Sequence, residues 1–255
     1  MIKFFRKIRQ RLLTENKFSK YLIYAIGEII LVVIGIFLAI QLNNLNENRK
    51  ERDREFTFLV RLKDDINSDI TDLSLNDSIA ASSESSSSKA LEVFYKSKTV
   101  EDILTTDSLF KFTWTNIIVN RKTYDEMLNT SGIYILKNKK LRNQLTDYYT
   151  LIETFQQFIR EMNSDSQLLR KNENLNAHNF LIKEHGKPWI NSKKIDTTWI
   201  GDFNSPTMLA LHKFYNHAQG ALNISRQRML KAIIEKSNLL VADIEKELKS
   251  KNYKE

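Results

Sequence analysis

The 255-residue chain contains no cysteine, only two prolines and only six glycines. The absence of cysteine excludes disulfide bonds, thiolate metal ligands and thiol nucleophiles. Because prolines and glycines are so few, little material is available for the tight turns of a many-stranded β protein, and a few long helices are favoured. The composition therefore predicts an all-α fold that is held together by its apolar core.

A basic surface is also missing outside the N-terminal tail. The chain carries a net charge of +8, but residues 1–20 hold seven Lys and Arg against one acid, a net of +6. The other 235 residues therefore carry only +2, which leaves no basic stripe of the kind that binds nucleic acid. We predict that the chain has no nucleic-acid partner.

The longest apolar stretch is residues 21–42, where 14 of 22 residues are Ile, Leu, Val or Phe. As a helix, this stretch is roughly 33 Å long, enough to cross a hydrocarbon core of about 30 Å. Since the cationic tail precedes it, the positive-inside rule places the N-terminus in the cytoplasm and residues 43–255 outside. A cleaved signal peptide is the alternative, but no A-x-A-like cleavage site follows. We expect an uncleaved, single-pass transmembrane helix.

The tail, residues 1–20, has the pattern of a short basic amphipathic helix. Its cations, which include Lys3, Arg6, Lys7, Arg9 and Arg11, fall opposite a face of apolar residues. Such a helix lies on an anionic lipid surface, and we expect the tail to bind the inner leaflet. A solvated flank that only sets the topology is the alternative.

Four residues inside the span carry its polar and helix-packing features. Gly27, Gly35 and Ala39 fall near one helix face and would let a second helix approach closely. Glu28 is the single charge, and it has two interpretations: coupling to a partner or a proton path, or contact with headgroups near the cytoplasmic boundary.

Residues 43–255 are predicted to form one extended, antiparallel helical bundle domain, because apolar residues recur there at helical spacing. The span is expected to continue outward, with apolar positions from Phe56 to Leu73. A Ser-rich run at 82–88 is either a polar helix face or a flexible break. Residues 105–108 (TTDS) offer N-cap candidates, and 123–130 read as a short helix that Gly132 stops.

Two further segments have the strongest helical patterns. The first is a heptad seam typical of a bundle or coiled coil: Leu141, Leu145, Tyr148, Ile152, Phe155, Ile159, Met162, Ser166 and Leu169. It is expected to end by Gly186-Lys187-Pro188. The second begins at Ser205-Pro206, an N-cap followed by an N1 proline. Its inward positions are predicted to be Leu211, Tyr215, Ala218, Leu222, Met229, Ile233, Leu240, Ile244 and Leu248.

No motif for chemistry stands out. The histidine pairs 178/185 and 212/217 lack the i, i+4 spacing of a zinc site, and surface histidines explain them better. The acids at 64, 65, 69 and 72 are interpreted as a solvated helix face. We therefore predict no catalytic residues, no metal and no cofactor. Trp189 and Trp199, in the loop after Pro188, are the candidates for ligand or partner contact, although aromatics there are more often core residues.

Two stretches resemble an uncharacterised family of bacterial single-pass membrane proteins, known only as a domain of unknown function. They are KYLIYAIGEIILVVIGIFLAIQLNNLNENRK at 20–50 and TYDEMLNTSGIYILKNKKLRNQLTDYYTLIE at 123–153. The matching positions include Gly27, Glu28, Gly35, Gln41, Asn43, Asn44, Leu141, Arg142, Tyr148 and Tyr149. The resemblance implies a membrane protein of the bacterial cell envelope with a helical extracytoplasmic part, and it implies no activity. We accordingly expect the span in the inner membrane and residues 43–255 in the periplasm.

These observations lead to a ranked set of hypotheses. The first is a non-enzymatic interaction or scaffold module of the cell envelope, whose partners are the lipid bilayer and either a second copy or another envelope protein. The second is a periplasmic sensor that binds a small ligand near Trp189 and Trp199 and relays its state through the span. An enzyme ranks last, because no recognised site geometry appears in the sequence.

Overall fold

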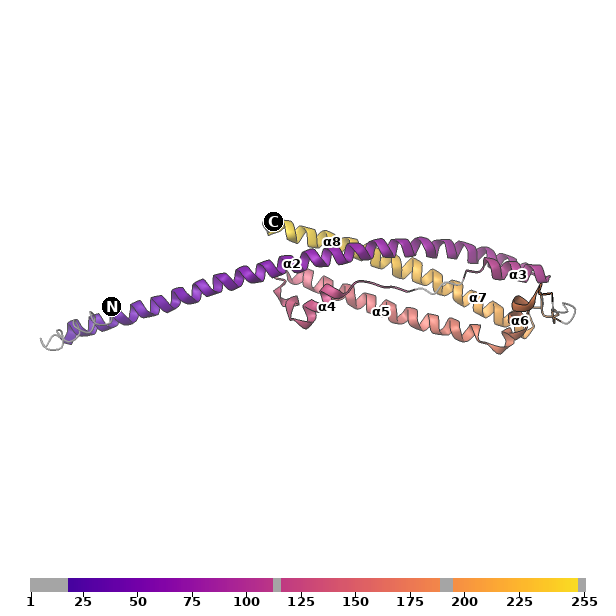
Figure 1. Ribbon diagram of the computed structural model, residues 1–255, viewed down its shortest axis with the longest axis horizontal. Coiled ribbons are helices and arrows are strands. Elements are labelled where there is room, and N and C mark those ends of the chain that lie inside the picture. Colours follow the sequence, from indigo (N-terminus) through magenta and orange to yellow (C-terminus); the bar gives the residue numbers. More distant parts are fainter. Residues whose placement is uncertain (1–17, 112–115, 189–194, 252–255) are drawn as a thin grey trace. The chain divides into compact units, whose positions relative to one another are not determined.

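The computed structural model describes residues 18–111, 116–188 and 195–251 (Figure 1). Within these residues every regular element is a helix and no strand is present, which confirms the predicted all-α fold. The chain separates into two compact units, Met1–Phe56 and Thr57–Glu255. Each unit is described by itself.

The described part of the first unit is the beginning of helix α2, which runs over Phe18–Lys96. In the described residues, this is the one helix that is long and apolar enough to cross a membrane. Its large apolar side chains are exposed in this single chain, for example Ile23 at 71% and Leu42 at 68%. The predicted membrane-surface cations Lys3, Arg6, Lys7, Arg9 and Arg11 lie outside the described residues.

The second unit is a helical bundle built from the rest of α2 and the elements that follow it. In chain order these are α3 (Val100–Leu109), α4 (Lys122–Asn129), η1 (Gly132–Ile135), α5 (Lys139–Arg170), η2 (Glu173–Leu175), α6 (Asn176–Glu184), α7 (Pro206–Ile224), η4 (Ser225–Leu230) and α8 (Lys231–Ser250). Helix η4 is a π-helical turn that joins α7 directly to α8.

Helix α8 runs antiparallel to α5. The Tyr148 hydroxyl bonds the Ser237 hydroxyl at 2.8 Å, and nearer the start of α5 the Asn138 amide donates to Glu247 at 2.7 Å. Along α5, rising residue numbers thus meet falling numbers on α8. The same holds between α2 and α7.

Between α2 and α7, the Gln219 amide donates to Ser88 and the Asn223 amide donates to Glu84, both at 2.7 Å. Rising residue numbers on α7 therefore meet falling numbers on α2. Since α7 and α8 form one continuous rod, α2 and α5 run parallel to each other and antiparallel to it (Figure 1).

Two parallel helices need a connection that returns along the bundle, and residues 116–121 are part of it. Asn120 N–H donates to Asp69 at 2.8 Å, and the Asn120 side chain donates to Asp65 at 2.7 Å. From the other side, the Gln156 amide donates to the carbonyl of buried Ile117 at 2.8 Å. The extended backbone, which has no neighbouring strand, is thus bonded to side chains of α2 and α5.

The core confirms the helical periodicity seen in the sequence. Of the predicted heptad on α5, every position is buried except Phe155 and Leu169, which are half-buried. The predicted inward face of the last rod is buried as well, with Leu248 half-buried. Ser205 caps α7 by accepting from Met208 N–H, and Pro206 occupies its first turn, as predicted. The Ser-rich run is helical, and Ser83 and Ser87 are buried.

Two local predictions were wrong. Residues 105–108 do not cap a helix, since they lie inside α3; its N-cap is Thr99, which forms a capping box with Asp102. Gly132 is not the left-handed stop after α4, because Ser131 takes that conformation at φ 54°. A Cβ on Gly132 would instead lie 2.9 Å from the Phe58 ring, so a close approach explains the glycine there.

Gly201 provides a test of how the loop before α7 docks on the end of α2. Its φ is +78°, and a Cβ there would lie 3.0 Å from the backbone oxygen of Ser97. We expect Gly201→Ala to lower the free energy of unfolding by on the order of 2 kcal/mol. Thermal and urea unfolding of the full chain in detergent, followed by circular dichroism, measures this.

Gly220 is the matched control, because it lies within α7 and a Cβ added to it would meet nothing within 4 Å. Gly220→Ala should raise stability by about 0.5–1 kcal/mol, since alanine is the better helix former. Equal effects of the two substitutions would contradict the tight docking at Gly201.

Candidate ligand site at the end of the bundle

A pocket of about 520 Å³ lies at the end of the bundle where α5 finishes and α7 begins. Its walls come from α3 and the residues just after it, the end of α5, η2, α6 and the first half of α7. The lining residues are Asp107, Phe110, Lys111, Arg170, Leu175, His178, Asn179, Ile182, Lys183, Leu211, Phe214 and Tyr215. We call this the distal pocket, and its volume lies within the range of small-molecule sites.

The floor of the distal pocket is aromatic and apolar. Phe110 packs on Tyr215 with ring centroids 4.5 Å apart, and Phe214 lies 6.0 Å from Phe110. These rings join the second core cluster, which also holds Leu211 and Leu175. The pocket is therefore a half-open hollow whose floor is part of a packed core.

His178 is the buried titratable group of this wall. It is only 6% exposed, and neither of its ring nitrogens has a hydrogen-bond partner of good geometry in the described residues. The nearest carboxylate is Asp107, at 3.9 Å from Nε2. Burial lowers the pKa of His178, and the Asp107 charge and the neighbouring Asn179 side chain oppose this only in part. The imidazole is accordingly neutral at pH 7.

Tyr215 is the second buried polar group of the wall. Its side chain is 2% exposed, and its hydroxyl has no partner in the part of the chain that the structure describes. Burial raises the pKa of this hydroxyl, so it stays protonated and can donate. A buried polar group without a partner costs about 1–3 kcal/mol, which a ligand that bonds it would recover.

Trp199, one of the two tryptophans singled out from the sequence, is not among the residues that line this pocket. Trp199 is buried at 5% exposure and its indole N–H donates to the Asp196 carbonyl at 2.9 Å. It meets His178 edge to face, with centroids 6.3 Å apart, and so supports the imidazole from behind. Trp189 lies outside the described residues.

Sequence reasoning missed His178, which was interpreted as a surface residue. The available signal was its position, because His178 lies three residues before Leu181 and three after Leu175 in a helical register whose apolar members are buried. Of the other histidines, His212 lies 3.3 Å from the Tyr95 hydroxyl and His217 lies 3.4 Å from the Met162 carbonyl. The described residues contain no cluster of three metal-ligating side chains.

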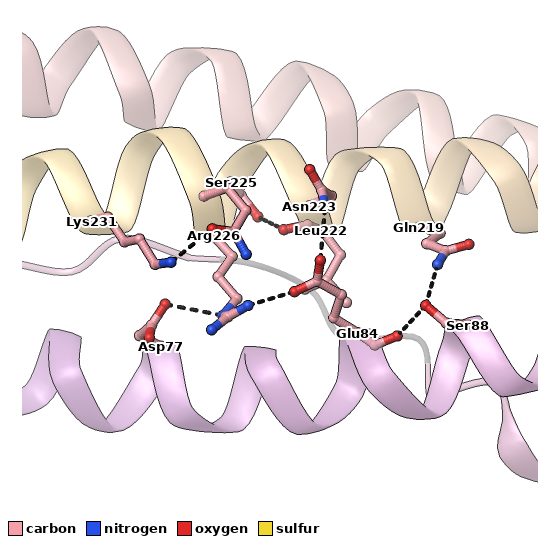
Figure 2. Close-up of polar contacts among 10 residues, drawn as sticks. Asp77, Glu84, Ser88, Gln219, Leu222, Asn223, Ser225, Arg226 and Lys231 are labelled. Atoms are coloured by element: carbon pink, nitrogen blue, oxygen red, sulfur yellow. Dashed lines mark hydrogen bonds and ion pairs between the residues drawn. The ribbon is translucent and has the colours of Figure 1, made fainter.

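A second polar group of residues lies between α2 and the α7–η4 junction, and Figure 2 shows it. Arg226, in the π-helical turn, pairs with Asp77 at 3.1 Å and donates to Glu84 at 2.6 Å. Burial opposes the charge of Glu84, but the bonds from Arg226 and Asn223 hold its pKa below the ordinary value. The charges of this layer are matched to one another, so it fixes helix register and offers nothing to a ligand.

The acids Asp65 and Asp69 form a third polar group, and the prediction of a solvated face is wrong for them. Asp69 is 3% exposed, and one of its oxygens has no hydrogen-bond partner in the described chain. Burial raises the pKa of Asp69 to about 6, against which the Asn120 N–H acts only in part. Asp65 and Asp69 hold the return segment, so their role is structural.

The small-residue face of the span is open in this single chain. Nothing lies within 4 Å of where a Cβ would be on Gly27 or on Gly35. Glu28 is half-exposed and Ala39 is exposed on the same helix. The helix-packing role of Gly27, Gly35 and Ala39 and the two interpretations of Glu28 remain hypotheses.

The fold and the pocket together define a helical protein with one helix that could span a membrane and a second, helical unit that contains a ligand-sized pocket. The sequence profile of DUF6090, a family of unknown function, matches residues 28–163, which is more than half of the chain. The chain therefore belongs to this family. Comparison with curated proteins and with solved structures gives no match. Much of the distal pocket, from Arg170 onward, follows the matched region.

The raised pKa of Asp69 predicts a pH dependence of stability. Between its ordinary value of 3.8 and about 6, the folded chain binds more protons than the unfolded chain. The contribution of Asp69 to the free energy of unfolding therefore falls as the pH rises through that range. Asp69→Asn removes the titration, so its stability relative to the natural chain should improve between pH 4 and pH 7.5, by on the order of 2 kcal/mol.

Asp64→Asn is the control for that measurement, because Asp64 is exposed on the same helix. Urea unfolding at pH 4 and pH 7.5 measures the free energy of unfolding of each variant relative to the natural chain. A difference that is the same at pH 4 and pH 7.5 for Asp69→Asn would show that Asp69 is charged in the fold.

Proposed function

We propose that the chain is a membrane-anchored receptor module that binds a small ligand in the distal pocket. Residues 21–42 would cross the inner membrane of a bacterium, with the basic tail in the cytoplasm and residues 43–255 in the periplasm. We propose that the bound state is passed through the span to a partner protein. No catalytic role is part of this proposal.

The observation that carries the proposal is the pair of unsatisfied polar groups in the wall of a ligand-sized pocket. Folded proteins pair nearly all their buried polar atoms, so each exception calls for an explanation. Other exceptions in the described residues, among them atoms of Asp69, Ser87 and Tyr149, do not line this pocket. His178 and Tyr215 are two such exceptions in one wall, and their pocket has a volume of about 520 Å³. A scaffold that used only its outer surface would gain nothing from this arrangement.

A second candidate function is the interaction or scaffold module favoured by the sequence alone. The open face around Gly27, Gly35 and Ala39 supports it, because a second transmembrane helix could pack there closely. The two functions are compatible, since a receptor that pairs through its span can signal by changing that pairing. The pocket makes ligand binding the more informative of the two to test.

A blocking substitution at the pocket mouth tests the receptor function. Asn179 is exposed and lines the distal pocket beside His178, so Asn179→Trp would fill the mouth of the pocket. We expect some member of a library of neutral, cationic and anionic metabolites to raise the melting temperature of the full chain in nanodiscs. The rise should disappear in Asn179→Trp.

Asn143→Trp is the matched control, because Asn143 is exposed on α5 and does not line the pocket. It should respond to the ligand as the natural chain does. The receptor function is wrong if no compound stabilises the chain, or if every stabilising compound still does so in Asn179→Trp.

A further inference from the structure

We infer that the ligand of the distal pocket is a small organic anion, with a carboxylate or phosphate group on an apolar or aromatic body. This rests on the proposed receptor function and adds the chemical class of the ligand. The inference comes from how charge, apolar surface and unsatisfied polar atoms are distributed around the pocket.

The charge of the wall is strongly positive. Lys111 after α3, Arg170 at the end of α5 and Lys183 in α6 line the pocket, and Asp107 is its one acid. In the described chain, none of these three cations makes a hydrogen bond or an ion pair with a carboxylate. Elsewhere in the bundle, Arg61, Arg121 and Arg226 are each paired with acids.

An excess of unpaired cations around a concave site raises the local concentration of anions and favours their binding. Arg170 can bond a carboxylate or a phosphate with two parallel N–H groups, while the lysines act as point charges. These cations are exposed and the apolar floor lies beneath them. The charged group of the ligand therefore belongs at the mouth of the pocket, and its apolar body belongs against Phe110, Phe214 and Leu211.

The buried polar atoms fit the same ligand. The Tyr215 hydroxyl can donate to an anionic oxygen, and His178 can do so by either ring nitrogen once its tautomer adjusts. A bound anion would also favour protonation of His178, whose pKa burial now lowers. A cationic ligand, in contrast, would meet three like charges and would leave both buried donors without an acceptor.

The test compares two anionic probes with a neutral compound of closely similar shape. Phenylacetate and phenyl phosphate carry the two anionic groups, and phenylacetamide is the neutral isostere of the first. Binding to the full chain is measured by calorimetry and thermal shift in nanodiscs of neutral phosphatidylcholine, so that no anionic headgroup competes. We expect at least one anionic probe to bind at or below about 10 mM, and phenylacetamide to bind at least tenfold more weakly.

Two arginines on one helix supply matched variants. Arg170→Gln removes a pocket cation from the exposed end of α5, and we expect it to weaken binding of the anionic probe about tenfold. Arg160→Gln removes an exposed cation from the same helix away from the pocket, and it should change the affinity less than twofold. Whether the carboxylate or the phosphate probe binds more tightly identifies which of the two groups the site prefers.

The outcomes separate this inference from the receptor function. If phenylacetamide, or neutral library compounds alone, bind and lose binding in Asn179→Trp, the pocket is a receptor site but the anion class is wrong. If the anionic probes bind equally well to Arg170→Gln and Arg160→Gln, the charge of the pocket is not what binds them. If neither the anionic probes nor the library compounds bind, both proposals fall together.

Discussion

One apolar stripe along the continuous rod of α7, η4 and α8 holds the second unit together, because both α2 and α5 pack against it. In its first half, Leu211 and Ala218 belong to the core cluster that includes Phe94 of α2. In its second half, Ile233 and Ile244 belong to the cluster that α5 shares. At about 1.5–3 kcal/mol for each fully buried aliphatic side chain, this stripe outweighs any single polar contact in the unit.

The π-helical turn lies between the two halves of that stripe. The extra residue in a π turn rotates the following helix relative to the preceding one, so the apolar face need not keep one strict heptad. At this junction the rod is bonded to α2 through Arg226 and its two carboxylates (Figure 2). Buried Ser83 and Ser87 leave room for close helix packing there. Small and charged residues thus fix the register that apolar packing alone would leave loosely defined.

Features that repeat along one helix could be predicted from the sequence, and features made by distant segments could not. The buried face of α5 follows from spacing alone, and the capping of α7 by Ser205 follows from one dipeptide. In contrast, Asp69 is buried because a segment about fifty residues away covers it. His178 is buried against Trp199, about twenty residues further along the chain, and beside Asp107 of α3. The spacing of residues along one helix does not show which distant segments will cover them, so the pocket could be identified only from the structure.

The central claim, that an anion binds beside His178, is tested most directly by the imidazole itself. With four histidines in the chain, selective isotope labelling gives few enough NMR signals for each to be assigned. The charged or titratable groups that share the pocket with the ring are Asp107, Lys111, Arg170, Lys183 and Tyr215. Phenylacetate is the suitable probe, since its charge is constant over the range in which histidine titrates. We predict that saturating phenylacetate shifts the His178 signal and raises its pKa, while the signal of exposed His185 stays unchanged. A His178 signal that keeps its position and its pKa while phenylacetate binds would contradict the account.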